Sequence, residues 1–480
     1  MTTRVVLAAL AGAVAVACVT NPATGRRQLN IMSEAQEIAL GKETDAQIRQ
    51  EMGVYPDEAW QRYVSEIGMR MARQSHRPNL PWTFTVVDAQ AVNAFALPGG
   101  YIYVTRGILP FLRDEAELAN VLGHEIGHVT AQHGANAWSK QALTGVTLGI
   151  GRLFVEQQHQ AWFSVAEGAF GLLYLKHGRD DELESDRLGV GYAAALGWDP
   201  SGMAGLLGTL GRISNASGSS RGVPNFLSTH PMPEDRVAKI GPNADAVRTP
   251  STTTTNARAF ADRLDGLVWG DSREQGFVRG RDFLHPILRV GVRFPEGWQV
   301  SNGASQVTAT PSDDSTRAML LEIVDAQGES PTRVARARMA KADVTEIWGE
   351  TLRLNGLSAF VGTYVGGSGN DRIALRGAWI ESGGRLYQFL GLSTEATFAR
   401  ADVQFRQAVS SFRALTQSEA DALQPARIDF HTIRQGETWA ILAQTRAEGL
   451  ISAQTLAIMN GADPASTPAP GTRIRIVVGG

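Results

Sequence analysis

The motif HExxH, from His124 to His128, constrains the fold of this chain more than any other feature of its sequence. It lies in a segment with helical spacing of apolar residues, which starts at Asp114 and has Glu117 in position to complete a capping box. Histidines at positions i and i+4 lie on one face of a helix, close enough to bind one Zn²⁺ ion through nitrogen. Glu125 projects beside them. The pattern therefore predicts a metal site on a helix, with a carboxylate next to it.

The alternative is that His124 and His128 are ordinary helix residues that bind no metal. A catalytic zinc needs three protein ligands and one open position, so a third ligand must lie elsewhere. The chain has one cysteine, Cys18, which excludes an internal disulfide and a thiolate cluster and leaves His, Asp and Glu as ligands. The metzincin pattern requires Gly and His where this chain has Ala131 and Gly134, so that class is excluded.

Acidic residues on a second predicted helix, from about Asp180 to Leu196, are the better candidates for the third ligand. Glu182 and Asp186 share one face of that helix, so the first can bind the metal while the second supports a ligand histidine. The other acidic residues there fit a solvated helix start, which the helix dipole favours: Asp180, Asp181 and Glu184. His133 lies about 140° around the helix from His128, and is predicted to point away as a surface or packing residue.

Five motifs stand out in the first half of the chain: Asn21 to Gly25, Asn93 to Gly100, His124 to His128, Glu182 to Asp186, and Thr229 to Pro231. Together they resemble family forty-eight of the metallopeptidases over about residues 21 to 245. That family contains the CAAX prenyl proteases, the heat-shock protease HtpX and the periplasmic β-barrel assembly-enhancing proteases, and the resemblance is to the last branch. It implies a zincin-type peptidase domain with one zinc ion per chain, Glu182 as third ligand and Asp186 behind the ligands. Ser185 stands where the family usually has Ala.

The resemblance to the periplasmic branch also implies a regulatory residue. His230 is expected to approach the zinc on a mobile loop and to take the water position, which keeps the resting enzyme inhibited. The alternative is a loop histidine that only forms a hydrogen bond near the cleft. Arg236 is a candidate for stabilising an oxyanion. A predicted hairpin begins at Asn93, Ala94 and Phe95, and its strands can bind an extended substrate through backbone hydrogen bonds.

These residue types predict a zinc-dependent endopeptidase of the gluzincin type, with Glu125 as the catalytic general base. Unfolded or misassembled envelope proteins are the expected substrates, in protein quality control. An alternative is an envelope chaperone or assembly factor with little proteolysis, against which the intact Glu125 argues. A peptidoglycan hydrolase is a weaker alternative, because the H-x-H and HxxxD ligand patterns of common zinc murein hydrolases are absent from the sequence.

Residues 1–17 predict export from the cytoplasm. They carry Arg4 and then an apolar stretch from Val5 to Ala17, with the charge, length and ending of a signal peptide. Two cleavage sites compete, because Ala15 to Ala17 fits an A-x-A site while Ala17 and Cys18 resemble a lipobox with lipidation at Cys18. Both predict the periplasm, and the lipobox predicts a lipoprotein anchored to the outer membrane. With 45 basic and 48 acidic residues and a net charge of -3, nucleic acid is not an expected partner.

The length of 480 residues is too great for one hydrophobic core, and the signals indicate an α+β protein of several domains. A mainly helical peptidase domain with a small β-hairpin or sheet is expected at 18–248, followed by a polar linker at 249–264. Residues 265–418 show alternating strands and helical stretches near 332–351 and 398–413, which predicts a small α+β domain of unknown role.

Residues 427–480 resemble a LysM domain, with the order strand, helix, helix, strand. The loop Gly436 to Thr438 matches the usual Gly-Asp-Thr with one conservative change, and the last strand runs through Ile474 and Ile476. LysM domains commonly bind glycans that contain N-acetylglucosamine, so the resemblance implies peptidoglycan as a partner. The alternative is a divergent module that only stabilises the protein or binds another partner.

Overall fold

The computed structural model describes residues 18–479 except 22, 148–176, 217–225, 232–233, 304, 313, 315 and 368–371. The predicted signal peptide and the side chain of Cys18 lie outside the described residues, so lipidation stays a prediction. The described chain forms two compact units. The first comprises residues up to 49, 53–269 and 427–479, and the second comprises 50–52 and 270–426. No helix within the described ranges is both long and apolar enough to cross a membrane.

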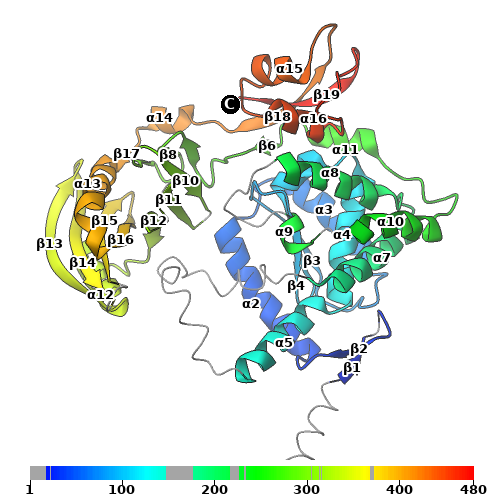
Figure 1. Ribbon diagram of the computed structural model, residues 1–480, viewed down its shortest axis with the longest axis horizontal. Helices are drawn as coiled ribbons and strands as arrows, with labels where there is room; N and C mark the ends of the chain where they lie inside the picture. Colours follow the sequence, from blue (N-terminus) through cyan, green and yellow to red (C-terminus); the bar gives the residue numbers. More distant parts are fainter. Residues whose placement is uncertain are drawn as a thin grey trace, which may run out of the picture. The chain divides into compact units, whose positions relative to one another are not determined.

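Helices make up most of the first unit (Figure 1). The HExxH motif lies on α4 (Glu115–Thr130), and every residue of this helix from Ala116 to Thr130 is buried. The N-cap at Asp114 is confirmed, since its side chain accepts a hydrogen bond from the Glu117 N–H at 2.9 Å. The predicted capping box is not formed, because Glu117 Oε2 accepts instead from the Arg113 N–H at 2.7 Å. The other helices of this unit before the C-terminal segment are α2 (Glu34–Met52), α3 (Glu58–Ala72), α5 (His133–Thr147), α7 (Arg179–Ala195), α8 (Gly202–Ala216), α9 (Phe226–Thr229), α10 (Glu234–Val247) and α11 (Ala257–Arg263).

A small sheet packs against α4 through β4. Its strands are β3 (Thr83–Val87), β5 (Tyr101–Thr105) and β4 (Ala94–Leu97), in the order β3-β5-β4. The predicted hairpin is confirmed, because β4 pairs with β5 in antiparallel register. Gly99 and Gly100 make the turn between them with φ angles of 84° and 100°, which favour glycine. β4 is the last strand in the order, so it lies at an edge of the sheet. A separate pair is formed by β1 (Cys18–Thr20) and β2 (Arg27–Leu29).

Glycines allow α7 to cross α4 at very short distance. A Cβ atom added to Gly189 would lie 2.5 Å from the His124 backbone nitrogen, and one added to Gly123 would lie 2.6 Å from the Gly189 carbonyl oxygen. Such distances are too short for any side chain, so the two backbones are in contact. This crossing brings the acidic face of α7, with Glu182 and Asp186, against the histidines of α4.

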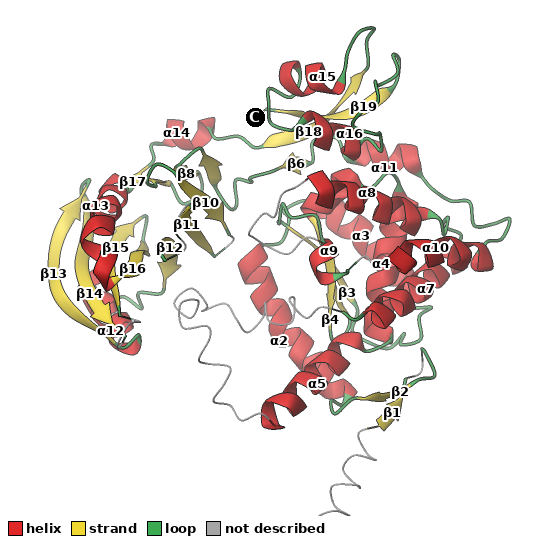
Figure 2. Cartoon of the chain, in the orientation of Figure 1, coloured by secondary structure: helices red, strands yellow, loops and turns green. Residues whose placement is uncertain are grey.

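The second unit is a sheet domain with helices on both faces (Figure 2). Arg376 and Gln388 point to opposite faces of its large sheet. Arg376 donates to Asp402 of α13 (Glu395–Ser411), and Gln388 accepts from Arg338 of α12 (Pro331–Lys341). The antiparallel large sheet has the order β10 (Trp298–Asn302), β11 (Gln306–Pro311), β12 (Ala318–Val324), β16 (Arg385–Thr394), β15 (Ile373–Ser382), β14 (Leu357–Gly366), β13 (Val344–Leu354). The smaller sheet has the order β17 (Arg413–Ala414), β9 (Val290–Arg293), β8 (Asp282–His285), β7 (Phe277–Arg279), and α14 (Gln417–Ala422) follows β17.

The α+β class expected for this region is confirmed, but one predicted helix is partly wrong. The stretch 332–351 is helical only to Lys341, and β13 begins at Val344. Asp343 has a φ angle of 53°, which no right-handed helix accommodates. The β-branched residues that follow, Val344, Thr345 and Ile347, favour a strand.

The C-terminal segment has the predicted order of elements. They are β18 (Ala426–Thr432), α15 (Trp439–Thr445), α16 (Ala453–Met459) and β19 (Arg473–Val478). The segment shares a three-stranded sheet with β6 (Val268–Trp269), in the order β19-β18-β6. It therefore belongs to the same compact unit as residues 53–269.

Candidate metal centre

Four side chains converge in the first unit: His124, His128, Glu182 and His230. One ligand atom from each lies within 4.8 Å of the others, and all four residues are buried. The Nε2 atoms of His124 and His128 are 3.0 Å apart. Glu182 Oε1 is 3.3 Å from His128 Nε2 and 3.0 Å from His230 Nδ1. The structure thus brings together the three predicted zinc ligands and the predicted regulatory histidine.

The donor set of this cluster fits a zinc ion, which takes imidazole nitrogen and carboxylate oxygen as ligands. Burial and the neighbouring His177 hold the pKa of His128 well below its usual value, so this ring is neutral and can bind a cation. Burial opposes the ionisation of Glu182. The positive charge of His230 and hydrogen bonds from His128 and His230 outweigh burial and hold the pKa of Glu182 well below its usual value. The cluster therefore offers a neutral nitrogen from His128 together with an anionic oxygen from Glu182.

Glu125 lies beside the cluster and is 1% exposed. Neither of its carboxylate oxygens accepts a hydrogen bond from any residue that the structure describes. His230 Nε2 is 3.6 Å from Glu125 Oε1, beyond hydrogen-bonding distance. Burial raises the pKa of this carboxyl. A buried carboxylate with free acceptor capacity next to a metal site has the properties of a general base.

Two buried residues support the cluster from behind. Asp186 Oδ1 lies 2.9 Å from His124 Nδ1, the ring nitrogen that faces away from the other ligands. Arg236 donates two hydrogen bonds to Asp186, at 2.7 and 2.9 Å, and its Nη1 is 2.6 Å from Glu182 Oε2. Asp186 thus holds a ligand histidine, as the sequence suggests. Arg236 contacts both carboxylates of α7, and the oxyanion role suggested for it stays a prediction.

The prediction that His133 points away from the ligands is wrong. The His133 side chain is buried, and its Nδ1 lies 3.0 Å from His128 Nδ1. The helical extrapolation fails because α4 ends at Thr130 and Gln132 has a φ angle of 58°. This left-handed residue starts α5 in a new direction, so His133 is not on the same helix as His128.

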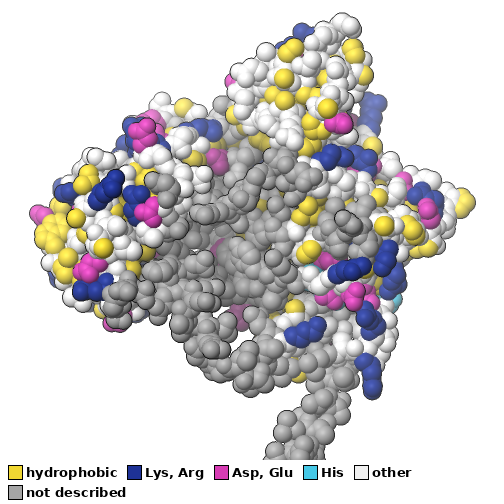
Figure 3. All heavy atoms as spheres, viewed as in Figure 1, with side chains coloured by type: hydrophobic (Ala, Val, Ile, Leu, Met, Phe, Trp, Pro, Cys, Tyr) yellow, Lys and Arg dark blue, Asp and Glu magenta, His cyan; other side chains and the backbone are white. Residues whose placement is uncertain are grey.

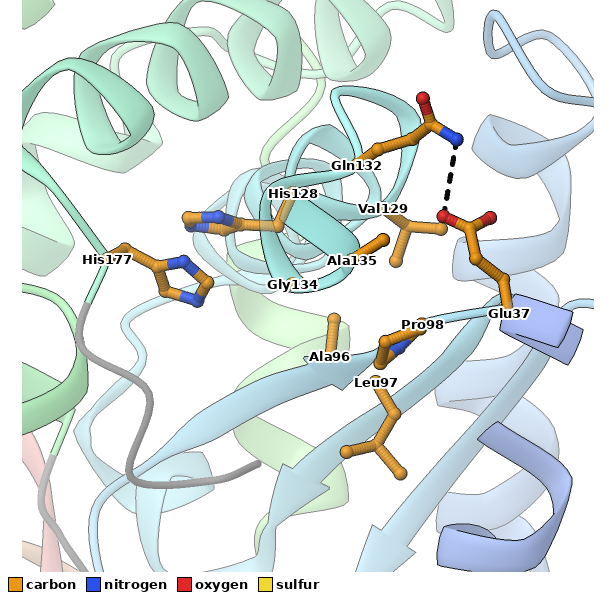
Figure 4. A pocket seen from close by; sticks show the side chains of 10 residues that line it. All are labelled: Glu37, Ala96, Leu97, Pro98, His128, Val129, Gln132, Gly134, Ala135 and His177. Atoms are coloured by element: carbon orange, nitrogen blue, oxygen red, sulfur yellow. Dashed lines mark hydrogen bonds between the residues drawn. The ribbon is translucent and has the colours of Figure 1, made fainter. Parts of the chain in front are cut away.

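His177 is a residue of the site that the sequence did not suggest. Its ring centroid is 3.9 Å from that of His128, and burial lowers the pKa of His177 to about 3. It lies just before α7 and belongs to no motif, so its only signal is that histidine is uncommon in this chain. Figure 4 shows its ring pointing toward His128 at the rim of a pocket that Ala96, Leu97 and Pro98 close on the other side.

The three predicted substrate-binding residues start the edge strand next to this pocket. Ala94 and Phe95 are buried in β4, and Phe95 stacks on Tyr103 with centroids 4.8 Å apart. The backbone N–H of Asn93 donates to Thr105 Oγ1. These side chains stabilise the sheet, and the pocket is lined by the residues that follow them, from Ala96 to Pro98.

Two histidines one turn apart on α4, a glutamate between them and a glutamate from a second helix define the class of HExxH metallopeptidases with a glutamate as third ligand. Residues 58–243 match Peptidase family M48. This part of the chain is similar to that family.

Several curated proteins are similar to the chain. The "Beta-barrel assembly-enhancing protease" of Escherichia coli (strain K12) is 29% identical over 238 residues, which cover 48% of this chain and 48% of that protein. The protein of the same name from Yersinia pestis is 28% identical over 250 residues, 50% of each chain. The "Mitochondrial metalloendopeptidase OMA1" of Schizosaccharomyces pombe is 31% identical over 227 residues, 46% of this chain and 64% of that protein. The chain spans about half the length of the bacterial relatives.

Proposed function

We propose that the chain is a zinc-dependent endopeptidase of the cell envelope, which hydrolyses peptide bonds of unfolded or misassembled envelope proteins. The observation that carries this proposal is the convergence of His124, His128 and Glu182 beside the buried Glu125, whose oxygens have no hydrogen-bond donor among the described residues. The names of the relatives, a β-barrel assembly-enhancing protease and a metalloendopeptidase, support both the reaction and the kind of substrate.

The chain's own residues perform defined steps in this reaction. His124, His128 and Glu182 would hold a zinc ion, which would supply Lewis-acid chemistry at the site. Glu125 takes the proton of the attacking water and delivers it to the leaving amine nitrogen. Asp186 keeps the His124 ring in place through its Nδ1 atom, 2.9 Å away.

The edge strand β4 is the proposed substrate platform. No strand of the described residues pairs with its outer edge, which can hydrogen-bond an extended peptide and so give affinity with little dependence on side chains. The pocket between His177 and Ala96, Leu97 and Pro98 lies beside His128, next to this strand. This mode of binding suits unfolded chains, because their backbone N–H and C=O groups are free to pair with the strand.

His230 is proposed to inhibit the resting enzyme. Its Nδ1 atom lies 3.3 Å from His124 Nε2 and 3.0 Å from Glu182 Oε1, so it can act as a fourth ligand. A zinc ion with four protein ligands has no position for water. Removal of the imidazole would then open the site.

The proposed location is the periplasm, with an outer-membrane anchor if Cys18 carries lipid. The relatives' name, which refers to β-barrel assembly, supports an envelope location. Peptidoglycan is proposed as a second partner through residues 427–480, supported by the strand, helix, helix, strand order that LysM domains have.

A second candidate function is that of an envelope chaperone or assembly factor with little proteolysis. The position of His230 among the metal ligands favours it, because a permanently filled fourth position would leave only client binding.

Metal removal and restoration test the two candidates. We expect a chelator to abolish cleavage of an unfolded β-sheet protein by the full chain, and one equivalent of zinc to restore it. His230→Ala should cleave faster than wild type and stay sensitive to the chelator. Cleavage that survives metal removal would contradict a metallopeptidase. Zinc binding without cleavage, in both wild type and His230→Ala, would favour the chaperone.

A further inference from the structure

We infer that His133 is a positioning residue that fixes the ring of the ligand His128 and completes a chain of hydrogen bonds from the metal cluster to Glu184 on α7. This inference rests on the proposed function, because it concerns the same metal site. It assigns a role to a histidine outside the HExxH motif, on a different helix from the residue it holds.

Both nitrogens of the His133 ring contact other side chains. Its Nδ1 lies 3.0 Å from His128 Nδ1, and its Nε2 lies 3.3 Å from Glu184 Oε2. Asp181 Oδ1 is 3.6 Å from the same Nε2, and Ser185 Oγ is 3.3 Å from Nδ1. The His133 ring is thus enclosed between the ligand histidine and the first turns of α7, with 4% of the residue exposed.

One placement of the protons on the His128 and His133 rings allows each of these contacts to be a hydrogen bond. His128 Nε2 faces the other ligands, so a metal takes its lone pair there and the ring proton must sit on Nδ1. His133 Nδ1 then accepts that proton in a hydrogen bond, and its own ring proton sits on Nε2. The Glu184 carboxylate accepts the second hydrogen bond. In each ring, therefore, one nitrogen donates a hydrogen bond and the other offers its lone pair.

The arrangement parallels the support of the other ligand histidine. His124 has its Nδ1 2.9 Å from the carboxylate of Asp186 directly, whereas His128 reaches the carboxylate of Glu184 through His133. Outer partners of this kind fix the orientation of a ligand ring and raise its basicity, and losing one commonly costs 10- to 100-fold in metal affinity.

The backbone between the two histidines is specialised for this contact. In a continuous helix His133 would lie about 140° from His128. Gln132 instead adopts a left-handed conformation with φ of 58°, which is uncommon for a residue other than glycine. Hydrogen bonds from the Gln28 amide to the Gln132 side-chain oxygen, at 2.6 Å, and from Gln132 to Glu37, at 3.2 Å, hold this residue in place. The break in the helix turns His133 back toward the ligand.

The test is zinc affinity of the full chain, measured by competition with a coloured chelator, together with the visible absorption of the Co²⁺-substituted protein. We expect His133→Ala to weaken zinc binding 10- to 100-fold and to change the Co²⁺ spectrum, because the His128 ring loses its fixed orientation. His133→Asn should recover most of the affinity, since its side-chain oxygen can accept from His128 Nδ1. His76→Ala, which removes an exposed histidine bonded to Tyr192, is the control and should bind zinc like wild type.

Glu184→Gln keeps the inference testable if His133→Ala does not fold. Glu184 is only partly buried, and its loss should weaken zinc binding by a smaller factor. Zinc affinity and Co²⁺ spectrum unchanged in both His133→Ala and Glu184→Gln would overturn the inference while leaving the proposed function intact. A wild-type chain that binds no zinc would overturn the proposed function itself, and this inference with it.

Discussion

Single residues at the metal centre show how buried charge is balanced. Glu125, Glu182, Asp186 and Arg236 are all 1% exposed or less. An isolated buried charge costs several kcal/mol, so such groups need partners. The guanidinium of Arg236 neutralises both α7 carboxylates, and only Glu125 is left without a hydrogen-bond donor among the described residues. The residue that lacks a partner is the one to which the proposed reaction assigns proton transfer.

A histidine of the second unit is expected to make that unit sensitive to acid. Burial lowers the pKa of His285 to about 4, below the value of about 6.5 for an unfolded chain. Between these two values the unfolded state binds a proton that the folded state excludes, so stability is complete above pH 6.5 and falls as the pH drops toward 4. Through this one group, the free energy of unfolding should fall by about 2 kcal/mol between pH 7 and pH 5.

The measurement is the free energy of unfolding by urea at pH 7 and pH 5, for wild type and His285→Gln. The glutamine can keep the hydrogen bond that the Leu288 N–H donates to His285, but it does not titrate. The variant should therefore lose less stability than wild type on acidification. An equal loss in both proteins would show that His285 does not carry the effect.

At the scale of elements, the contact between α4 and α7 decides whether the ligands meet. Gly189→Ala would place a Cβ atom 2.5 Å from the His124 backbone nitrogen and force the helices apart. We expect a loss of about 1–3 kcal/mol in stability and weaker zinc binding, because Glu182 and Asp186 move away from the histidines. Thermal unfolding and zinc titration measure the two effects.

Gly191→Ala is the matched control for this change. It lies on the same helix, and nothing lies within 4 Å of its added Cβ atom. Since alanine is the better helix former by about 1 kcal/mol, this variant should be as stable as wild type or more stable. If both variants bind zinc and unfold like wild type, the close crossing is not needed for the site.

The sequence predicts individual elements better than their ends. The cap at Asp114, the i, i+4 spacing of His124 and His128 and the shared face of Glu182 and Asp186 follow from local rules, and the structure contains each of them. The breaks at Gln132 and Asp343 were not predicted, because an ordinary residue adopts a left-handed conformation only where distant contacts hold it. The roles of His133 and His177 depend on these long-range contacts, so local spacing could not reveal them.

At the scale of the molecule, the C-terminal segment is integrated with the peptidase domain. The Ile428 N–H in β18 donates to the carbonyl oxygen of Leu267, just before β6, at 2.8 Å. Local sequence patterns do not predict a contact over so long a separation. Basic and acidic side chains are interspersed over the described surface seen in Figure 3, in agreement with the net charge of -3.

Arg475 is the clearest link between this segment and the peptidase domain. It is buried, and its guanidinium donates to the carbonyl oxygens of Pro110 at 2.7 Å, Met459 at 3.1 Å and Arg113 at 3.3 Å. Pro110 and Arg113 precede α4, so the contact supports the start of the active-site helix. Arg475→Met should lower the free energy of unfolding by about 3 kcal/mol, because buried carbonyl groups lose a charged hydrogen-bond donor.

Arg473→Met is the control on the same strand. Arg473 is about half exposed and pairs with Asp262 at 2.6 Å, and an exposed ion pair contributes about 1 kcal/mol or less. Thermal unfolding should therefore show a clear loss for Arg475→Met and a small one for Arg473→Met. Equal effects would mean that the C-terminal segment does not support α4 through Arg475.

The most direct test of a zinc endopeptidase is a rate of cleavage. The full chain, loaded with one zinc ion, is mixed with an unfolded protein, and the appearance of new peptide amino termini is followed. Wild type should produce them, and Glu125→Gln at the same zinc content should be at least about 100-fold slower, because general base catalysis contributes that much. Equal rates in the two proteins, or no new termini from wild type and His230→Ala alike, would contradict a zinc endopeptidase with Glu125 as its base.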